Sequence, residues 1–325
     1  MSMRILVLRT LLAAMFALFV LPAHASYQDA LKAYQEKRWP AAFVEANLLA
    51  QQGNARGQAL LAAMYAQGLG VKRDLRQAQK WYASAADQGH AGASFALGLM
   101  YLDGRAGGLD LDKARKLFEK AAAKGHAASS HNIALIYAGA GGGQPDWKKA
   151  AEWFAKAADK DFPEAQYNLG ILYADGRGVV KDLVKASFWL SKAALKGLRD
   201  AARDYGIMIF RGDGVQRNRK IGAQWLLVAA NKGDVEAQSR VAKLYMKGLG
   251  VEKNPVEAVR WHLLARESGM KDQELEILAA ALETNQLAKA QRLALDWRRT
   301  TGIKPNAGRN SSVAKGSTAS STQSQ

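Results

Sequence analysis

An internal repeat with a constant length of 36 residues runs through most of this chain. Each repeat starts at a glycine, or at Asp161 in the fourth, and no insertion or deletion separates successive starts. The six starts are Gly53, Gly89, Gly125, Asp161, Gly197 and Gly233, and Gly269 closes the sixth repeat. A fixed period of this length indicates that each repeat is one supersecondary unit that stacks on its neighbours.

Two bulky residues recur, and each is kept in five of the six copies. Twelve residues after the start (offset twelve) stand Tyr65, Tyr101, Tyr137, Tyr173 and Tyr245, with Ile209 as the exception. At offset 28 stand Trp81, Trp153, Trp189, Trp225 and Trp261, with Leu117 as the exception. Small residues recur at Gly98, Gly170, Gly206, Ala78, Ala114 and Ala186. We expect the small residues to let paired helices approach closely, and the aromatic residues to fill the space between neighbouring pairs.

Within each repeat, the residues predict a helix, a turn and a second helix. In the fourth repeat Pro163 suits the first turn of a helix, and glycines at 176 and 178 end that helix. Asp182 then stands where its carboxylate can cap the second helix. The same position holds Asp74, Asp110, Asp146, Asn218 and Asn254 in the other repeats. The third repeat has a glycine run, residues 139–143, and we expect a loosened turn there.

The residues of the fourth repeat also carry a family resemblance. They include Ala165–Gly170, Tyr173, Gly176–Val179, Asp182, Lys185–Ala186, Trp189 and Lys192–Ala194. This pattern resembles the Sel1-like repeat, a relative of the tetratricopeptide repeat, and it covers two thirds of the chain. The resemblance implies an all-α fold: a right-handed α-solenoid of six helix-turn-helix repeats with helical caps. It also implies a protein-interaction scaffold of a kind that bacteria often export.

The regions outside the repeats predict a further four segments. Residues 1–25 have a basic start, an apolar run from Leu11 to Leu21 and the pattern Ala23-His24-Ala25, which is typical of a cleavable signal peptide. An uncleaved anchor is the alternative, but the run is shorter than the roughly 20 residues that span a bilayer. We expect cleavage after Ala25, a capping helix pair in residues 26–52, six repeats in 53–268, capping helices in 269–299 and a disordered tail in 300–325.

Charge and cysteine content narrow the environment and the partners. The net charge is +17 and the chain has no cysteine, so disulfides and thiolate chemistry are excluded. A strongly basic chain favours partners with acidic surfaces, such as an acidic protein, an acidic glycan or anionic lipid. Export argues against nucleic acid. We therefore expect a periplasmic protein of a Gram-negative envelope, with no transmembrane segment once the signal is removed.

Signs of catalysis are weak. The histidines lack the spacing of metal ligands, and we predict no metal, no cofactor and no catalytic residue. Ser268 and Lys271 form a Ser-x-x-Lys pattern of the kind used by acyl-serine enzymes, but the companion motifs are missing. A hydrolase of cell-wall or β-lactam substrates therefore remains the weakest alternative.

Two groups of residues are candidates for binding a partner. By analogy with tetratricopeptide repeats, offsets six and seven of the first helices would line a concave groove, although the aromatic residues there could instead be packing. These positions hold Phe95, His131, Tyr167, Arg203, Asn132, Asn168 and Arg240. The fifth repeat departs most from the pattern and concentrates positive charge, which predicts a basic patch for an acidic partner. Its residues are Arg199, Arg211, Arg217, Arg219 and Lys220.

The sequence thus predicts a non-enzymatic periplasmic scaffold, or adaptor, that binds another envelope protein through the solenoid surface. The alternative is an envelope factor that binds acidic polysaccharide or peptidoglycan directly through its charge.

Overall fold

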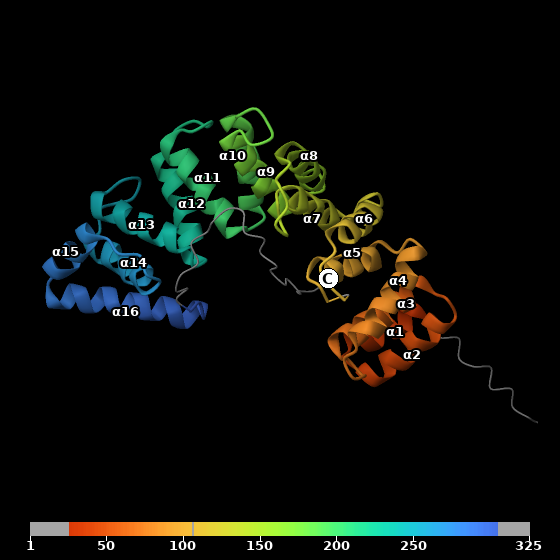
Figure 1. Ribbon diagram of the computed structural model, residues 1–325. Helices are drawn as coiled ribbons and strands as arrows, with labels where there is room; N and C mark the ends of the chain where they lie inside the picture. Colours follow the sequence, from red (N-terminus) through yellow and green to blue (C-terminus); the bar gives the residue numbers. More distant parts are fainter. Residues whose placement is uncertain (1–25, 106, 305–325) are drawn as a thin grey trace, which may run out of the picture. The chain divides into compact units, whose positions relative to one another are not determined.

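A computed structural model describes residues 26–105 and 107–304, and within them the chain forms sixteen α-helices and no strand (Figure 1). The predicted all-α class is therefore confirmed. The expected signal peptide, residues 1–25, and residues 305–325 of the expected tail lie outside the described residues. The chain divides into two compact units, up to Leu97 and from Gly98 onward, and each is described by itself.

The first unit contains four complete helices. They are α1 (Tyr27–Gln35), α2 (Trp39–Gln51), α3 (Ala55–Gln67) and α4 (Leu75–Asp87), followed by the first part of α5 (Ala91–Leu102). Helices α1 and α2 occupy the segment in which we expected a capping pair, and the Ser26 hydroxyl caps α1 by accepting from the Asp29 N–H. Alanine and leucine side chains from α1, α2 and α3 share one buried cluster. The end of the array is thus closed by apolar contacts with the first repeat.

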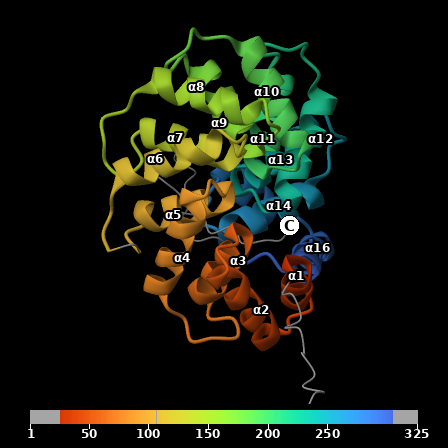
Figure 2. The same cartoon turned by 90° about the vertical axis from the view of Figure 1, so that its right-hand side faces the viewer.

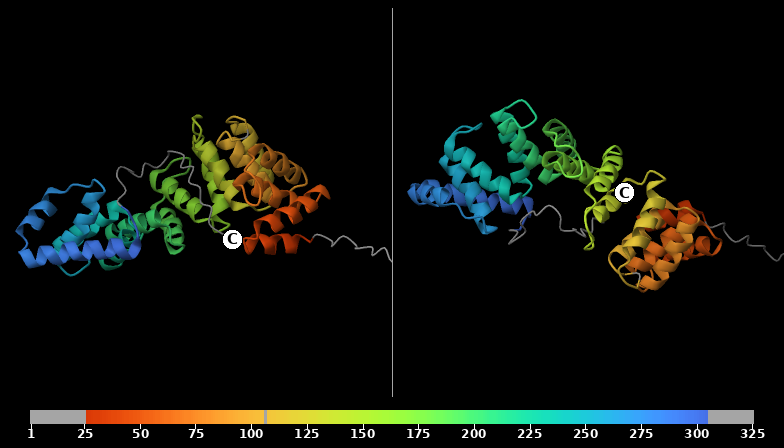
Figure 3. Two further views of the ribbon diagram at one scale, coloured as in Figure 1. Left: turned by 90° about the horizontal axis from the view of Figure 1, so that it is seen from below. Right: turned by 45° about the horizontal axis from the view of Figure 1, so that its top comes forward.

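The second unit contains the remaining helices. They are α6 (Leu111–Ala122), α7 (Ala127–Tyr137), α8 (Trp147–Ala158), α9 (Pro163–Asp175), α10 (Leu183–Leu195), α11 (Arg199–Arg211), α12 (Arg219–Asn231), α13 (Val235–Lys247), α14 (Pro255–Glu267), α15 (Gln273–Ala281) and α16 (Thr284–Thr301). From α7 onward each first helix packs on its own second helix, as α9 does on α10, and from α6 onward each second helix packs on the next first helix, as α10 does on α11. In Figure 2 the second helices α8, α10 and α12 follow the outer edge of this unit. The two views of Figure 3 show the same succession of helix pairs.

The predicted caps of the second helices are confirmed. The Asp182 carboxylate accepts from the Lys185 N–H at 2.9 Å, and the Asn218 side chain accepts from the Ile221 N–H at 3.0 Å. Asp74, Asp110, Asp146 and Asn254 cap their helices in the same way. Each cap residue also donates its own backbone N–H to the carbonyl at offset twelve, as Asp182 does to Tyr173 at 2.9 Å. Ile209 can replace tyrosine in this second contact because a main-chain carbonyl makes it.

The small-residue columns bring helices together as expected. A Cβ atom on Gly170 would lie 2.8 Å from Leu190 Cγ, and one on Gly206 would lie 3.1 Å from the Gly222 carbonyl oxygen. Both distances are too short for an ordinary contact, so in the fourth and fifth repeats the first helix rests directly on its second helix. These two pairs are packed more closely than a Cβ would allow, whereas alanine holds the same column in the first, third and sixth repeats.

A second close approach joins consecutive repeats. Gly178, at φ +70°, lies against the Trp147 carbonyl at the start of the preceding second helix, where a Cβ atom would overlap that oxygen. Gly214 lies in the same way against the Leu183 carbonyl. In the third repeat Gly142 occupies this column, and no atom lies within 4 Å of where its Cβ would be. The third turn therefore lacks the contact that fixes the turns of the fourth and fifth repeats.

At the C-terminal end, helix α16 continues two residues past the boundary expected after Arg299 and ends at Thr301. The hydroxyls of Thr300 and Thr301 both donate to the Trp297 carbonyl. Gly302 ends the helix at φ +65°, and Ile303 then packs against the core of the last repeats. The ordered cap thus reaches at least residue 304.

The turn contact generates a stability prediction. Replacing Gly178→Ala places a methyl group on the Trp147 carbonyl and forces alanine to a positive φ, so we expect a loss of about 2–4 kcal/mol of unfolding free energy. Gly125→Ala is the matched control, because Gly125 has φ +83° but no atom within 4 Å of a Cβ. It should lose only about 1 kcal/mol. Urea unfolding followed by circular dichroism measures both, and equal losses would show that the turn can shift without cost.

Candidate binding surface

The offset-six and offset-seven residues form contacts between consecutive first helices. Asn168 on α9 places its amide nitrogen 3.3 Å from His131 Nε2 on α7, and the same amide donates to the Glu164 carbonyl at 2.9 Å. The His131 ring also packs at 5.1 Å from Phe162 and 5.5 Å from Phe154, measured between ring centroids. Burial lowers the pKa of His131 to about 4, so the ring is neutral near pH 7 and its Nε2 can accept the Asn168 hydrogen bond.

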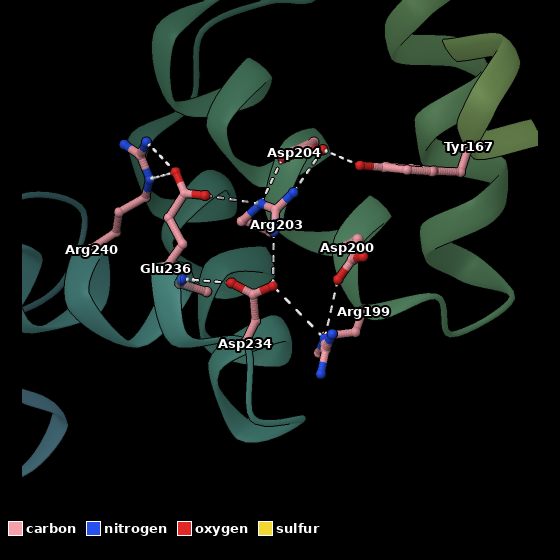
Figure 4. A network of polar contacts seen from close by, with 9 residues as sticks. Tyr167, Arg199, Asp200, Arg203, Asp204, Asp234, Glu236 and Arg240 are labelled. Atoms are coloured by element: carbon pink, nitrogen blue, oxygen red, sulfur yellow. Dashed lines mark hydrogen bonds and ion pairs between the residues drawn. The ribbon is translucent and has the colours of Figure 1, made fainter. Parts of the chain in front are cut away.

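One repeat further, the same columns form a larger polar network (Figure 4). The Tyr167 hydroxyl on α9 donates to Asp204 Oδ2 on α11 at 3.0 Å. Arg203 holds the same carboxylate with two hydrogen bonds, from Nε at 2.7 Å and from Nη2 at 3.1 Å. Burial, and then the Asp204 carboxylate, raise the pKa of the Tyr167 phenol, so this hydroxyl stays protonated and acts as a donor.

Arg203 continues the network towards the sixth repeat. Its Nη1 donates to Asp234 Oδ2 at 2.9 Å, and its Nε lies 3.7 Å from Glu236 Oε2. The side chains of Arg203 and Asp234 are only 7% and 4% exposed. Burial is the largest single effect and would lower the pKa of Arg203, but its hydrogen bonding to Asp204 and the charges of Asp204 and Asp234 together raise the pKa, so the guanidinium remains charged. Arg203 is therefore a buried joint between repeats, and our placement of it on an open groove is wrong.

Arg199 and Arg240 lie at the edges of the same network. Arg199 Nε is 3.1 Å from Asp200 Oδ1 and 3.8 Å from Asp234 Oδ2, while Arg240 donates to Glu236 at 2.7 Å. The three arginines (Arg199, Arg203, Arg240) face four carboxylates (Asp200, Asp204, Asp234, Glu236), so the formal charge of the network is −1. Arg199 thus belongs to a charge-compensated group and not to the basic patch that the sequence indicated.

The other four residues of that patch remain together at the fifth turn. Arg211 ends α11, Arg217 lies in the turn, and Arg219 and Lys220 open α12. All four are exposed. Among the residues that the structure describes, no carboxylate lies within ion-pair distance of any of them. We call Arg211, Arg217, Arg219 and Lys220 the basic turn.

The remaining groove candidates lie apart. Phe95 is half-buried on α5 in the first unit, and the structure does not place it relative to His131. Asn132 is half-buried and donates to the Ala128 carbonyl of its own helix at 2.8 Å. Ser268 ends α14 and lines a small cavity with Trp297 and Arg298, and Lys271 is not among the lining residues.

A comparison with protein families identifies the repeat. The model of the Sel1 repeat matches six consecutive segments, residues 55–90, 91–126, 127–162, 163–198, 199–234 and 235–270, which are two thirds of the chain. The chain belongs to the Sel1 repeat family. Sel1 repeat proteins are protein-interaction scaffolds, and the fold is generally non-enzymatic.

Solved structures support the Sel1 assignment. A protective antigen present in uropathogenic Escherichia coli strains, described as displaying an SLR fold, is 28% identical with a TM-score of 0.74. The match covers 89% of this chain but only 65% of that protein. A Sel1 repeat protein from Oxalobacter formigenes is also 28% identical, with a TM-score of 0.63, over 75% of this chain and 97% of that one. A search of curated proteins gave no match.

The sequence missed the acidic partners of this Sel1 network. Asp234 follows Gly233, where it also caps α13 by accepting from the Ala237 N–H at 2.8 Å. One signal was present: Arg203 stands in a column that holds an aromatic residue or histidine in the three preceding repeats, and a charge placed there requires a carboxylate. The sequence could not show which carboxylate, because Asp234 lies 31 residues further along the chain.

The buried network predicts unequal costs for two arginines of the Sel1 array. Arg203→Met leaves Asp204 and Asp234 without their main partner, and we expect a loss of about 3–5 kcal/mol of unfolding free energy. Arg240→Met is the control, because its ion pair with Glu236 is about 40% exposed on both sides and should contribute less than about 1 kcal/mol. Urea unfolding of both variants measures the difference. Similar small losses would contradict a structural role for the network.

The half-buried His131, with its lowered pKa, predicts a pH dependence. Between its ordinary pKa of 6.5 and about 4, the unfolded chain binds a proton that the folded chain does not bind. The stability that neutral His131 contributes is therefore complete above pH 6.5 and decreases as the pH falls towards 4. We expect the wild type to lose about 2–3 kcal/mol more than His131→Tyr between pH 7 and pH 4, by urea unfolding. Equal losses would show that this ring does not titrate with unfolding.

Proposed function

We propose that this chain is an exported scaffold of a Gram-negative envelope, which binds another envelope protein through an acidic surface on that partner. The basic turn is the observation that carries the proposal. Four cations lie together there, and in the part of the chain that the structure describes no carboxylate comes within ion-pair distance of them, whereas the arginines of the neighbouring network are all compensated. Unpaired charge on a fixed surface favours a partner of opposite charge and speeds its association.

The backbone of the basic turn is held in place before any partner arrives. Gly212, at φ +90°, ends α11, and Gly214 rests on the Leu183 carbonyl. Val215 packs against the cluster formed by α10 and α11. A surface that is already ordered loses little conformational entropy on binding, so this turn is better suited to recognition than a free loop of the same charge.

The export part of the proposal rests on the sequence. The basic start, the apolar run and the Ala-x-Ala pattern of residues 1–25 support a cleavable signal, and the absence of cysteine is compatible with a periplasm. Among the described residues, no helix has both the length and the apolar character needed to cross a membrane.

The row of offset-six and offset-seven residues on the first helices makes a smaller contribution to the proposed surface. Asn168 and Arg240 are half-buried and hydrogen-bonded, Asn168 to the Glu164 carbonyl and Arg240 to Glu236, and both retain exposed side-chain area. The row therefore offers a mixed polar surface, and the basic turn supplies the excess of positive charge. We assign the main electrostatic attraction to the basic turn.

The test compares two charge reversals of equal size. Arg217→Glu, Arg219→Glu and Lys220→Glu together should reduce partner crosslinking in cells about tenfold, because attraction becomes repulsion. The control replaces the exposed Lys116, Lys124 and Lys148 with glutamate, which changes the net charge by the same amount. A photo-crosslinker at Gln216 reports partner capture, and circular dichroism checks that helix content is unchanged. Equal capture by both variants would remove the basic turn from the binding surface.

The same variants separate a protein partner from an acidic glycan. A glycan held by overall charge would be lost in both reversals and would be released by moderate salt, because screening weakens exposed charge pairs. A protein partner bound at the basic turn should be lost in one reversal only. Loss of capture in both variants, together with salt-sensitive binding to purified peptidoglycan, would contradict a protein partner and favour direct binding of an acidic glycan.

A further inference from the structure

The outer face of α10 carries apolar side chains where the other repeats carry polar ones. Val184, Phe188 and Leu195 are 66%, 53% and 74% exposed, and Val180 in the preceding turn is 88% exposed. At 100° per residue, the three helical positions fall within about 40° of one another. They therefore form one stripe, which together with Val180 we call the α10 stripe.

The other five repeats show which residues the fold accepts at the positions of the α10 stripe. In the column of Phe188 the other five repeats have Lys80, Lys116, Glu152, Gln224 and Arg260. In the column of Leu195 they have Asp87, Ala123, Asp159, Asn231 and Glu267. In the column of Val184 four of the other five are charged, and Val256 is the exception. The fold does not need apolar residues at these positions, so the α10 stripe is not explained by packing within the repeat.

The single hydroxyl along the stripe is satisfied within the helix. Ser191 lies between Phe188 and Leu195 on this face, and its Oγ donates to the Phe188 carbonyl at 2.7 Å. The α10 stripe therefore presents no free hydrogen-bonding group that a polar ligand would need. Its exposed area is apolar over most of the length of α10, and surfaces of this kind mark contacts with proteins or membranes.

Positive charge borders the stripe along one side and at its beginning. Lys185, Lys192 and Lys196 lie on the adjacent face, where Lys185 and Lys192 reach Asp182 and Asp161 only at 3.6 Å. Among the described residues, Lys196 has no carboxylate within ion-pair distance. The basic turn adjoins the N-terminal end of α10, because Ser187 Oγ donates to the Gly214 carbonyl at 3.4 Å. The apolar face thus continues into an uncompensated cationic surface.

We propose that the α10 stripe and its basic border dock on a membrane surface that contains anionic phospholipid. An amphipathic helix with apolar residues on one face and lysines beside them lies in the interface, with its apolar side chains among the acyl chains. The lysines and the basic turn then reach the anionic head groups. This inference goes beyond the proposed scaffold function and needs no protein partner.

The lysines beside the α10 stripe also argue against a second copy of the chain as the molecule that covers this face. Two α10 stripes packed together would bring Lys185, Lys192 and Lys196 of both copies to one interface without additional carboxylates. Like charges in an apolar contact destabilise it. An acidic protein segment satisfies the charge of the lysines but not the apolar side chains of the stripe, whereas a membrane offers anionic head groups and acyl chains together.

The first test separates apolar insertion from attraction by charge. Val184→Lys, Phe188→Gln and Leu195→Asn together introduce the residues that the fifth repeat has in these columns, so the fold should tolerate them. The variant gains one positive charge. If the stripe inserts, binding of the mature chain to phosphatidylglycerol-containing vesicles should fall about tenfold, although charge alone would strengthen it. Equal or tighter binding by the variant, or no binding by the wild type, would overturn the proposal.

The second test uses the absence of native cysteine. An environment-sensitive dye on Leu195→Cys should shift to the blue when vesicles containing phosphatidylglycerol are added, and should not shift with phosphatidylcholine alone. Ala123→Cys is the matched control, because Ala123 is exposed in the same column two repeats earlier within the second unit. Its dye should not respond. A response at both positions or at neither would overturn the assignment of the contact to α10.

Discussion

The contact on which the array depends is a main-chain contact between repeats. In the turns that carry it, a glycine lies against the carbonyl at the start of the preceding second helix: Gly70 on Trp39, Gly178 on Trp147, Gly214 on Leu183 and Gly250 on Arg219. No other residue fits, because a Cβ would overlap that main-chain carbonyl. The cap residue of the next helix is then fixed by its hydrogen bond to the offset-twelve carbonyl. In these four turns two main-chain contacts thus set the path of the chain.

Features within one repeat could be predicted from sequence, because they depend on neighbouring residues. The caps, the helix pairs and the close approach at Gly170 follow from local spacing and from the size of single residues. The extension of α16 was missed because composition alone indicated a tail, whereas the threonine hydroxyls hydrogen-bond back to the Trp297 carbonyl. The 36-residue period thus predicted the helix pairs, whereas it carried no information about where the last helix, α16, ends.

The structure groups the candidate site residues differently from the way the sequence pattern grouped them. Charge concentrated in the fifth repeat was one feature in the sequence, but the structure separates it into a compensated network and an uncompensated turn. Arg203 and Arg199 meet carboxylates from the sixth repeat and from their own helix. Arg217 and Arg219 meet none among the described residues. Only the fold could reveal this, because compensation depends on which helices face each other across a repeat boundary.

The departures from the repeat pattern therefore fall into two physical classes. Those that face inward are completed by the chain itself, as Arg203 is by the carboxylates of Asp204 and Asp234. Those that face outward stay exposed: Phe188 is 53% exposed although its ring contacts Trp189 and Lys192, and Arg217 has no carboxylate within ion-pair distance among the described residues. A departure that the fold compensates serves the fold. A departure that stays exposed is available to bury its apolar area, or to pair its charge, against another molecule. The two exposed groups, the α10 stripe and the basic turn, lie together around α10.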